Sequence, residues 1–384
     1  MENPFKYGGI VRGPYFADRN DELAELVQEM KNLSKIFLVS PRRFGKTCLL
    51  FNLMDRLRDQ RFAVAYLDLN AFPDVKGLAS ALPDATSKAL ESNMEKLLKI
   101  FAGFQRLRPK VTVEPDGSLT GTVELAVEEK EAIPALLEGL RHAEILAKRK
   151  GKKLIITIDE FSDLSKYNGQ TIEKAIRSEI QQHQHIGYIF SGSEQSVMLD
   201  MIQDKTRAFY KLGRIMTLGP IDRDTYTDFI HRWLKKGDYK AKRNDLKRLH
   251  ELGRDVPYNI QRLCHTMWEM AGEKRQITME LINQLPMMIA GQDSSHFELL
   301  WQAVSQPQRI LLMALSKESD PKPFSKEFQL THGIGPSSSI KASLDSLTKK
   351  GILFRRPQGS YAFSDAFMPY WINDLKRAAS KKSI

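Results

Sequence analysis

One short segment constrains the fold of this chain more than any other. The apolar residues 36–39 precede SPRRFGKT, residues 40–47, and an apolar series with helical spacing begins at Leu49. A strand, a tight loop and a helix in this order are typical of a phosphate-binding loop, because backbone N–H groups and the helix N-terminus attract an anion. The segment therefore predicts an α/β fold with a parallel sheet, whose ligands bind at the carboxyl ends of the strands.

The chemistry of this loop resides in its last three positions. Gly45, Lys46 and Thr47 match the end of the pattern G-x-x-x-x-G-K-[ST], and Ser40 replaces the first glycine. Lys46 is expected to contact the β- and γ-phosphates of a nucleotide, and the Thr47 hydroxyl is expected to bind Mg²⁺. The alternative is a basic turn before an ordinary helix. The predicted phosphate-contacting residues are Pro41, Arg42, Arg43, Phe44, Gly45, Lys46, Thr47 and Cys48.

A second motif supplies the carboxylates that phosphoryl transfer needs. The mostly aliphatic residues 154–158 are followed by Asp159 and Glu160, which is the arrangement of a Walker B strand. We expect Asp159 to hold the metal and Glu160 to act as the catalytic base. A core strand that ends in solvated acids is the alternative, and the presence of the phosphate loop makes it less favoured.

Two further positions are candidates for catalysis. The strand-like residues 185–190 end at Ser191 and Ser193, and either hydroxyl can serve as sensor 1 beside the γ-phosphate, or simply form a turn. Arg214 precedes another apolar strand and is predicted to act as an arginine finger on an adjacent protomer. A structural salt bridge is the alternative role for Arg214.

Composition limits the classes of protein. The 384 residues suggest two or three domains, and no apolar run approaches the roughly 18 residues of a membrane span. The first residues lack the basic and apolar regions of a signal peptide. Cys48 and Cys264 have no metal-ligand spacing. We therefore expect a cytoplasmic protein.

The net charge of +11 suggests an acidic partner such as nucleic acid. Residues 301–384 contain thirteen lysines and arginines against six acidic residues, and residues 231–248 form another basic run. Either region can equally be a solvated helical face. A hairpin is predicted at about residues 106–126, where Arg106, Arg108 and Lys110 either contact nucleic acid or belong to a packed surface element.

The chain is expected to continue beyond a core of residues 1–220 with two more domains. Helical patterns in residues 221–295 predict a small lid, in which Pro257 and Tyr258 pack on adenine or ribose. Residues 296–384 predict a winged helix, with three helices and two short strands, which contacts double-stranded DNA or another protein. The candidate DNA contacts are Ser337, Ser338, Lys341, Lys349, Arg355 and Arg356.

Together these motifs carry a family resemblance. The chain resembles the archaeal-type P-loop ATPases of the STAND branch, which are related to AAA+ replication initiators. The resemblance rests on SPRRFGKT, the strand ending DEF, the strand ending SGS, LGR, VPYNIQ and the winged helix. The resemblance covers about residues 3–375. It implies ATP and Mg²⁺, an ASCE sheet with a strand between the two Walker strands, a helical lid and a winged helix. In that family the loop tolerates a first residue other than Gly.

Two functions are compatible with this sequence. The first is an ATPase that acts on or with DNA and assembles into an oligomer through Arg214. The second is a STAND-type signalling switch, for example in host defence, which a protein partner releases. The sequence contains no motif that decides between them.

Overall fold

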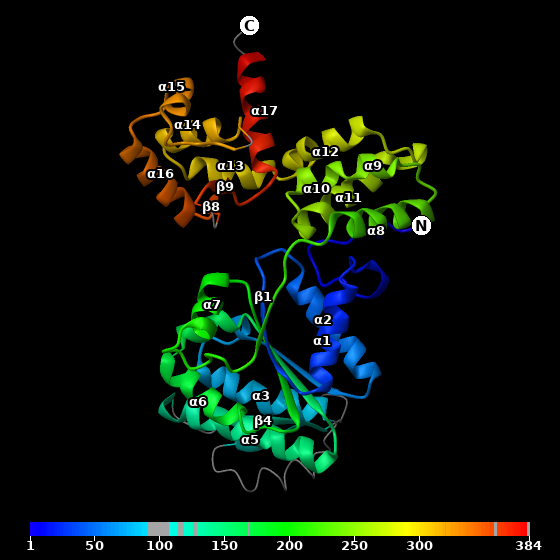
Figure 1. Ribbon diagram of the computed structural model, residues 1–384, viewed down its shortest axis with the longest axis vertical. Helices are drawn as coiled ribbons and strands as arrows, with labels where there is room; N and C mark the ends of the chain where they lie inside the picture. Colours follow the sequence, from blue (N-terminus) through cyan, green and yellow to red (C-terminus); the bar gives the residue numbers. More distant parts are fainter. Residues whose placement is uncertain are drawn as a thin grey trace. The chain divides into compact units, whose positions relative to one another are not determined.

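The computed structural model describes residues 1–90, 107–113, 119–125, 129–167, 169–318, 320–356 and 359–381. These residues form two compact units (Figure 1). We call Gly9–Pro220 the core unit, and Ile221–Ile384 together with Met1–Gly8 the C-terminal unit.

The core unit is built on a parallel sheet of five strands in the order β2-β5-β6-β1-β7. The strands are β1 (Lys35–Val39), β2 (Ala63–Asp68), β5 (Leu154–Asp159), β6 (Ile186–Gly192) and β7 (Arg214–Thr217). Each adjacent pair runs parallel. Because β6 lies between β1 and β5, the sheet has the intervening strand that the family resemblance implies.

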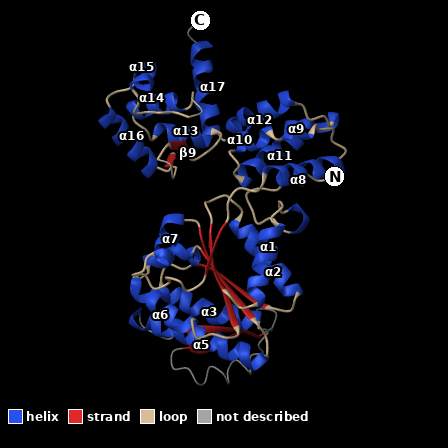
Figure 2. Ribbon diagram, viewed as in Figure 1, coloured by secondary structure: helices blue, strands red, loops and turns tan. Residues whose placement is uncertain are grey.

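Helices cover both faces of this sheet (Figure 2). Apolar side chains of α1 (Asn20–Lys31) and α2 (Lys46–Asp59) pack with Ile36, Leu38 and Ile189 on one face. On the other face, Phe37 and Phe190 pack with apolar side chains of four helices: α3 (Val75–Ala89), α5 (Ala132–Lys150), α6 (Gln170–Ile180) and α7 (Gln195–Gln203). A sheet covered on both faces needs continuous apolar strands, and all residues of β5 and β6 are buried.

An antiparallel pair of strands lies between α3 and α5 in the sequence. It consists of β3 (Leu107–Val113) and β4 (Leu119–Leu125). The predicted turn at residues 114–117 and the basic residue Arg106 lie outside the described residues.

The C-terminal unit is helical in its first half. It contains α8 (Arg223–Lys236), α9 (Arg243–Leu246), α10 (Arg248–Gly253), α11 (Pro257–Ala271), α12 (Met279–Gln292) and α13 (Ser294–Gln302). The first residues of the chain pack on α11, where the Asn3 amide donates to the His265 carbonyl at 3.1 Å and Phe5 meets Trp268 edge to face.

The second half of this unit has the predicted helices and wing. The helices α14 (Gln306–Leu315), α15 (Lys326–His332) and α16 (Ser337–Lys349) precede the antiparallel strands β8 (Leu353–Arg355) and β9 (Tyr361–Phe363). Ile340, Leu344 and Leu347 bury one face of α16. The terminal helix α17 (Met368–Lys381) follows.

Some basic residues of the run at residues 231–248 form ion pairs with neighbouring acids. Arg243 forms ion pairs with Asp224 and Asp228, and Lys247 also pairs with Asp224. All four side chains are exposed. This arrangement fits the solvated helical face, and a nucleic-acid contact by the other basic residues of the run stays a prediction.

None of the described helices is long and apolar enough to cross a membrane.

Candidate functional site

The phosphate loop joins β1 to α2. Gly45 has a φ of 85° and is the N-cap of α2, so glycine is required there for its left-handed backbone. Ser40 is fully buried, and its backbone N–H donates to the Gly192 carbonyl at 3.2 Å. Its small side chain therefore fits beside β6, which explains why the first position of the motif accepts serine.

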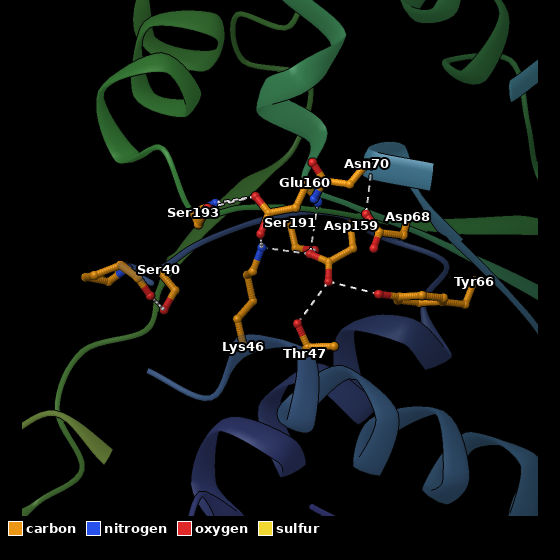
Figure 3. Close-up of polar contacts among 11 residues, drawn as sticks. Ser40, Lys46, Thr47, Tyr66, Asp68, Asn70, Asp159, Glu160, Ser191 and Ser193 are labelled. Carbon is orange, nitrogen blue, oxygen red and sulfur yellow. Dashed lines mark hydrogen bonds and ion pairs between the residues drawn. The ribbon is translucent and has the colours of Figure 1, made fainter. Parts of the chain in front are cut away.

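Lys46 lies in the first turn of α2 and connects the loop to the end of β5 (Figure 3). Its ammonium nitrogen is 2.7 Å from Asp159 Oδ1 and 2.8 Å from Glu160 Oε1. The Lys46 side chain is only 6% exposed. Burial makes such a pair costly unless its geometry is good and further hydrogen bonds support it, so the surrounding donors matter.

Asp159 receives those supporting hydrogen bonds. The hydroxyls of Thr47, Tyr66 and Ser191 donate to its carboxylate at 3.1, 3.0 and 2.6 Å. Burial opposes ionisation of Asp159, but the charge of Lys46 and the hydrogen bonds outweigh it and lower the pKa of the carboxyl group. Asp159 is therefore held as an anion, with its two oxygens fixed.

Glu160 is fixed by a different set of contacts. Its backbone is left-handed, with a φ of 50°, which is uncommon for a residue other than glycine. Glu160 Oε2 accepts hydrogen bonds from the backbone N–H and the hydroxyl of Ser193, at 3.1 and 2.8 Å. The two candidate serines thus contact different acids, since Ser191 bonds to Asp159 and Ser193 to Glu160.

The residues around Asp159 fit a magnesium ion. Among the described residues no group of three or more His, Cys, Asp and Glu side chains is placed to hold a metal. Mg²⁺ does not require one, because it keeps several waters and binds one or two carboxylates together with substrate phosphates. The Thr47 hydroxyl and the Asp159 carboxylate, 3.1 Å apart, supply the hard oxygen atoms that this ion prefers.

Comparison with known families agrees with this geometry. The model of an ATPase domain found predominantly in Archaea matches residues 16–263, more than half of the chain. The chain belongs to this archaeal-type ATPase family. A second model, a probable winged helix domain, matches residues 295–374. A search of curated proteins gave no match.

Solved structures share the fold of this archaeal-type ATPase. A Walker-type ATPase of Pyrococcus abyssi has a TM-score of 0.60 and 17% identity, over 96% of this chain and 99% of that chain. The ORC2 protein of Aeropyrum pernix, in ADPNP–ADP complexes, has a TM-score of 0.55 and 11% identity, over 99% and 98% of the two chains. The predicted α/β fold, with a P-loop core on a parallel sheet, further helices and a C-terminal winged helix, is confirmed.

Three other predicted residues belong to elements outside the network around Lys46: Arg214, Pro257 and Tyr258. Arg214 begins β7, opposite Ile36 near the start of β1, and pairs with Glu25 and Glu29 of α1. Within this chain Arg214 thus makes the structural salt bridge that was the alternative, and the arginine-finger role stays a prediction about an adjacent protomer. Pro257 and Tyr258 belong to α11 of the C-terminal unit, so their contact with adenine or ribose also stays a prediction.

Within the loop itself, the flanking residues differ in exposure. Arg42 and Arg43 are exposed, whereas Pro41 and Phe44 are partly buried. The sulfur of Cys48 accepts a hydrogen bond from the Val11 N–H at 3.3 Å, and burial raises the pKa of its thiol. Cys48 thus fixes the preceding chain segment onto α2.

Three contacts near the site were not predicted from the sequence. Tyr66 of β2 donates to Asp159, and burial beside that carboxylate raises the pKa of its hydroxyl, which therefore remains a donor. The buried Arg19 donates to the carbonyls of Phe44 and Gly219, at 3.1 and 2.7 Å. Asn52 of α2 donates to the Val11 carbonyl. Tyrosine at a strand end and arginine before a helix are too common in sequences to indicate these roles.

Five of the six predicted DNA contacts on the winged helix are exposed. Ser337, Ser338 and Lys341 are exposed near the N-terminus of α16, whereas Lys349 is at its other end. Arg355 is exposed at the end of β8, and Arg356 next to it is partly buried. The structure therefore groups the first three residues and separates Lys349 from them.

Proposed function

We propose that this chain hydrolyses ATP with Mg²⁺ and couples the reaction to double-stranded DNA through its winged helix. The observation that supports hydrolysis best is the single network that joins Lys46, Asp159 and Glu160 at the carboxyl ends of the strands. A loop lysine, a metal-binding carboxylate and a base are the recurring parts of phosphoryl transfer in P-loop enzymes.

Nucleotide binding would change the partners of Lys46. The phosphates compete with Asp159 and Glu160 for its ammonium group, while the first N–H groups of α2 attract the same anion. The Aeropyrum pernix ORC2 structure with ADPNP and ADP supports a nucleotide in this fold. Releasing Lys46 would leave Asp159 free to bind the metal together with Thr47.

Glu160 is the group best placed to deprotonate the attacking water. Its Oε2 is held by Ser193, so Oε1, which contacts Lys46 in this structure, becomes available when the lysine turns to phosphate. The proton would then move from water to Oε1. Bound Mg²⁺ would neutralise charge on the phosphates, and Thr47 and Asp159 would hold it.

Further parts of the proposal concern the C-terminal unit. Residues 221–295 would act as a lid, with Pro257 and Tyr258 against the base or ribose. The exposed serines at the start of α16, together with Lys341, are suited to phosphate and base-edge contacts of the kind a recognition helix makes. Arg214 would act in an oligomer, on the nucleotide of an adjacent protomer.

A nucleotide-dependent switch that works through a protein partner is the second candidate. Three apolar side chains around the predicted recognition region are exposed: Phe324 at 47%, Leu330 at 83% and Phe354 at 44%. DNA phosphates give such side chains no favourable contact, whereas apolar and aromatic residues are enriched at protein interfaces.

The decisive experiment measures ATP turnover by the purified chain with and without duplex DNA, at low and moderate salt, alongside Lys46→Ala and Glu160→Gln. We expect DNA to stimulate ATP turnover and higher salt to weaken this stimulation. Both variants should lose the turnover. A nucleotide that remains bound with little turnover, and no response to DNA, would contradict the DNA proposal and favour the switch.

A further inference from the structure

The C-terminal unit contains a cavity of about 410 Å³ that the ATPase site does not explain, and one of its lining residues, Arg356, is also a candidate DNA contact. The end of α10, the wing strands and the start of α17 contribute its walls. Arg254, Lys317 and Arg356 line it together with Ser316, Tyr361 and Tyr370. Three cationic side chains thus line one concave, partly open space, and two of them, Arg254 and Lys317, are exposed.

The backbone directs Arg254 into this space. Arg254 ends α10 in a left-handed conformation, with a φ of 55°, and Asp255 follows with a φ of 56°. Such conformations are strained for residues other than glycine, and they persist where the surroundings enforce them. The Asp255 carboxylate is engaged by the Arg223 guanidinium at 2.8 and 2.7 Å, so it does not neutralise Arg254.

The guanidinium of Arg254 is only partly used. One of its N–H groups donates to the Phe363 carbonyl at 3.1 Å. Burial and the nearby charge of Arg356 lower the pKa of Arg254, and the charge of Asp365 opposes this effect. Since arginine stays protonated in proteins, the cavity holds like charges that repel each other.

Two acidic side chains, Glu251 and Glu318, also line the cavity, so its lining has one more basic than acidic residue. Glu251 pairs with Arg248, and Glu318 pairs with His332 at 2.8 Å. In the part of the chain that the structure describes, neither Arg254 nor Arg356 forms an ion pair. Unpaired cations that converge on one concave surface repel each other, and an anion bound between them relieves this repulsion.

We propose that this cavity binds a small ligand that carries a phosphate group, at a site separate from the phosphate loop. Its volume falls within the range of small-molecule sites. Paired arginines are suited to phosphate because their planar N–H groups bind two oxygens at once. Tyr361 and Tyr370 offer aromatic surface for the rest of the ligand. A concave site favours a compact ligand over a DNA backbone, which runs across exposed surface.

Calorimetric titration of the full-length Lys46→Ala protein tests this proposal, because that variant weakens the phosphate loop. The probes are inorganic pyrophosphate and adenosine 5′-monophosphate, at low salt. We expect one binding site per chain. When Arg254→Gln or Arg356→Gln is added, the dissociation constant should rise at least tenfold, because a charge-assisted hydrogen bond is lost. Arg232→Gln is the matched control, since Arg232 is exposed on α8 and outside the cavity.

Three results would overturn the proposal. One is the absence of binding by either probe up to millimolar concentration. Another is equal affinity in the two cavity variants and the Arg232→Gln control, with cooperative thermal unfolding showing that all are folded. The third is that neither probe binds while both cavity variants lose affinity for duplex DNA, which would assign the arginines to the DNA surface. Two separate arginine variants keep the test valid if one fails to fold.

Discussion

Two charged regions of this ATPase differ in how their charges are held. At the carboxyl ends of the strands, Lys46 and Asp159 have side chains only 6% and 3% exposed, and each has several partners. On the winged helix, Ser338 and Lys341 are exposed, and Lys341 forms no ion pair with the described residues. A buried charge is tolerated only when it is paired, so the side chains of the first region are held in one arrangement. The exposed charges of the winged helix do not restrict the class of its partner in this way.

Replacing Lys46 is expected to have the largest effect. Lys46→Ala removes the cation from two carboxylates and from the predicted phosphate contact, so ATP turnover should fall by about a hundredfold or more, as removal of one electrostatic stabiliser does. Equilibrium binding of labelled ATP and turnover measure the change. The exposed Lys31→Ala serves as the control. Unchanged ATP affinity in Lys46→Ala would show that the buried network is structural only.

Glu160→Gln separates binding from chemistry at the same site. The amide keeps the shape of the side chain and a contact with Ser193 but removes the base, so turnover should fall about a hundredfold or more. ATP affinity should stay within a few-fold of that of the unmodified chain. Glu194→Gln, an exposed neutralisation at the N-cap of α7, is the matched control. Turnover at the normal rate would exclude Glu160 as the base.

Ser191→Ala tests the support of Asp159 through pH. Since the folded-state pKa of Asp159 is lowered, its stabilising contribution is present above the unfolded pKa of about 3.9 and is lost as pH falls through the folded pKa. Losing the Ser191 hydrogen bond raises the folded pKa, so the free energy of unfolding should drop by about 1–2 kcal/mol at pH 7. Acid unfolding should also begin at a higher pH.

Urea denaturation at pH 7 and at pH 3 measures this effect. The difference between Ser191→Ala and the unmodified chain should narrow at pH 3, where the Asp159 contribution is partly lost in both. The exposed Ser178→Ala should show no such difference. A difference that is constant across this range would mean that Ser191 acts by packing alone.

Lys341→Gln is expected to have the smallest effect, because its charge is exposed. It should weaken duplex binding about equally for all sequences and reduce the slope of log affinity against log salt by about one. Affinity measured at several salt concentrations gives this slope. Lys274→Gln, an exposed change in the same unit, is the control. If both variants bind DNA with the slope of the unmodified chain, α16 does not contact the phosphate backbone.

The sequence predicted the elements whose patterns are local. The continuous apolar runs at residues 36–39 and 154–158 gave nearly the observed bounds of β1 and β5. The helices α13 and α17 were not predicted. Their apolar residues are explained only by packing of one helix on the other, as in the contact between Phe297 and Trp371. Single-sequence patterns do not contain such tertiary pairs.

The site was predictable to the same extent. Lys46, Thr47, Asp159 and Glu160 follow from motif spacing, and the structure brings them together. The contact of Tyr66 with Asp159 depends on the register between β2 and β5, which no local pattern specifies. The same limit applies to Arg214, whose partners on α1 are distant in sequence.

The central claim is that the carboxylate beside Lys46 binds the metal that hydrolysis needs. The most direct measurement is ATP turnover by the unmodified chain and by Asp159→Asn, each titrated with Mg²⁺ from a metal-free state. We predict that the unmodified chain hydrolyses ATP only when Mg²⁺ is added, and that Asp159→Asn shows little turnover at any Mg²⁺ concentration. Equal Mg²⁺ dependence in both proteins, or full turnover without the metal, would contradict it.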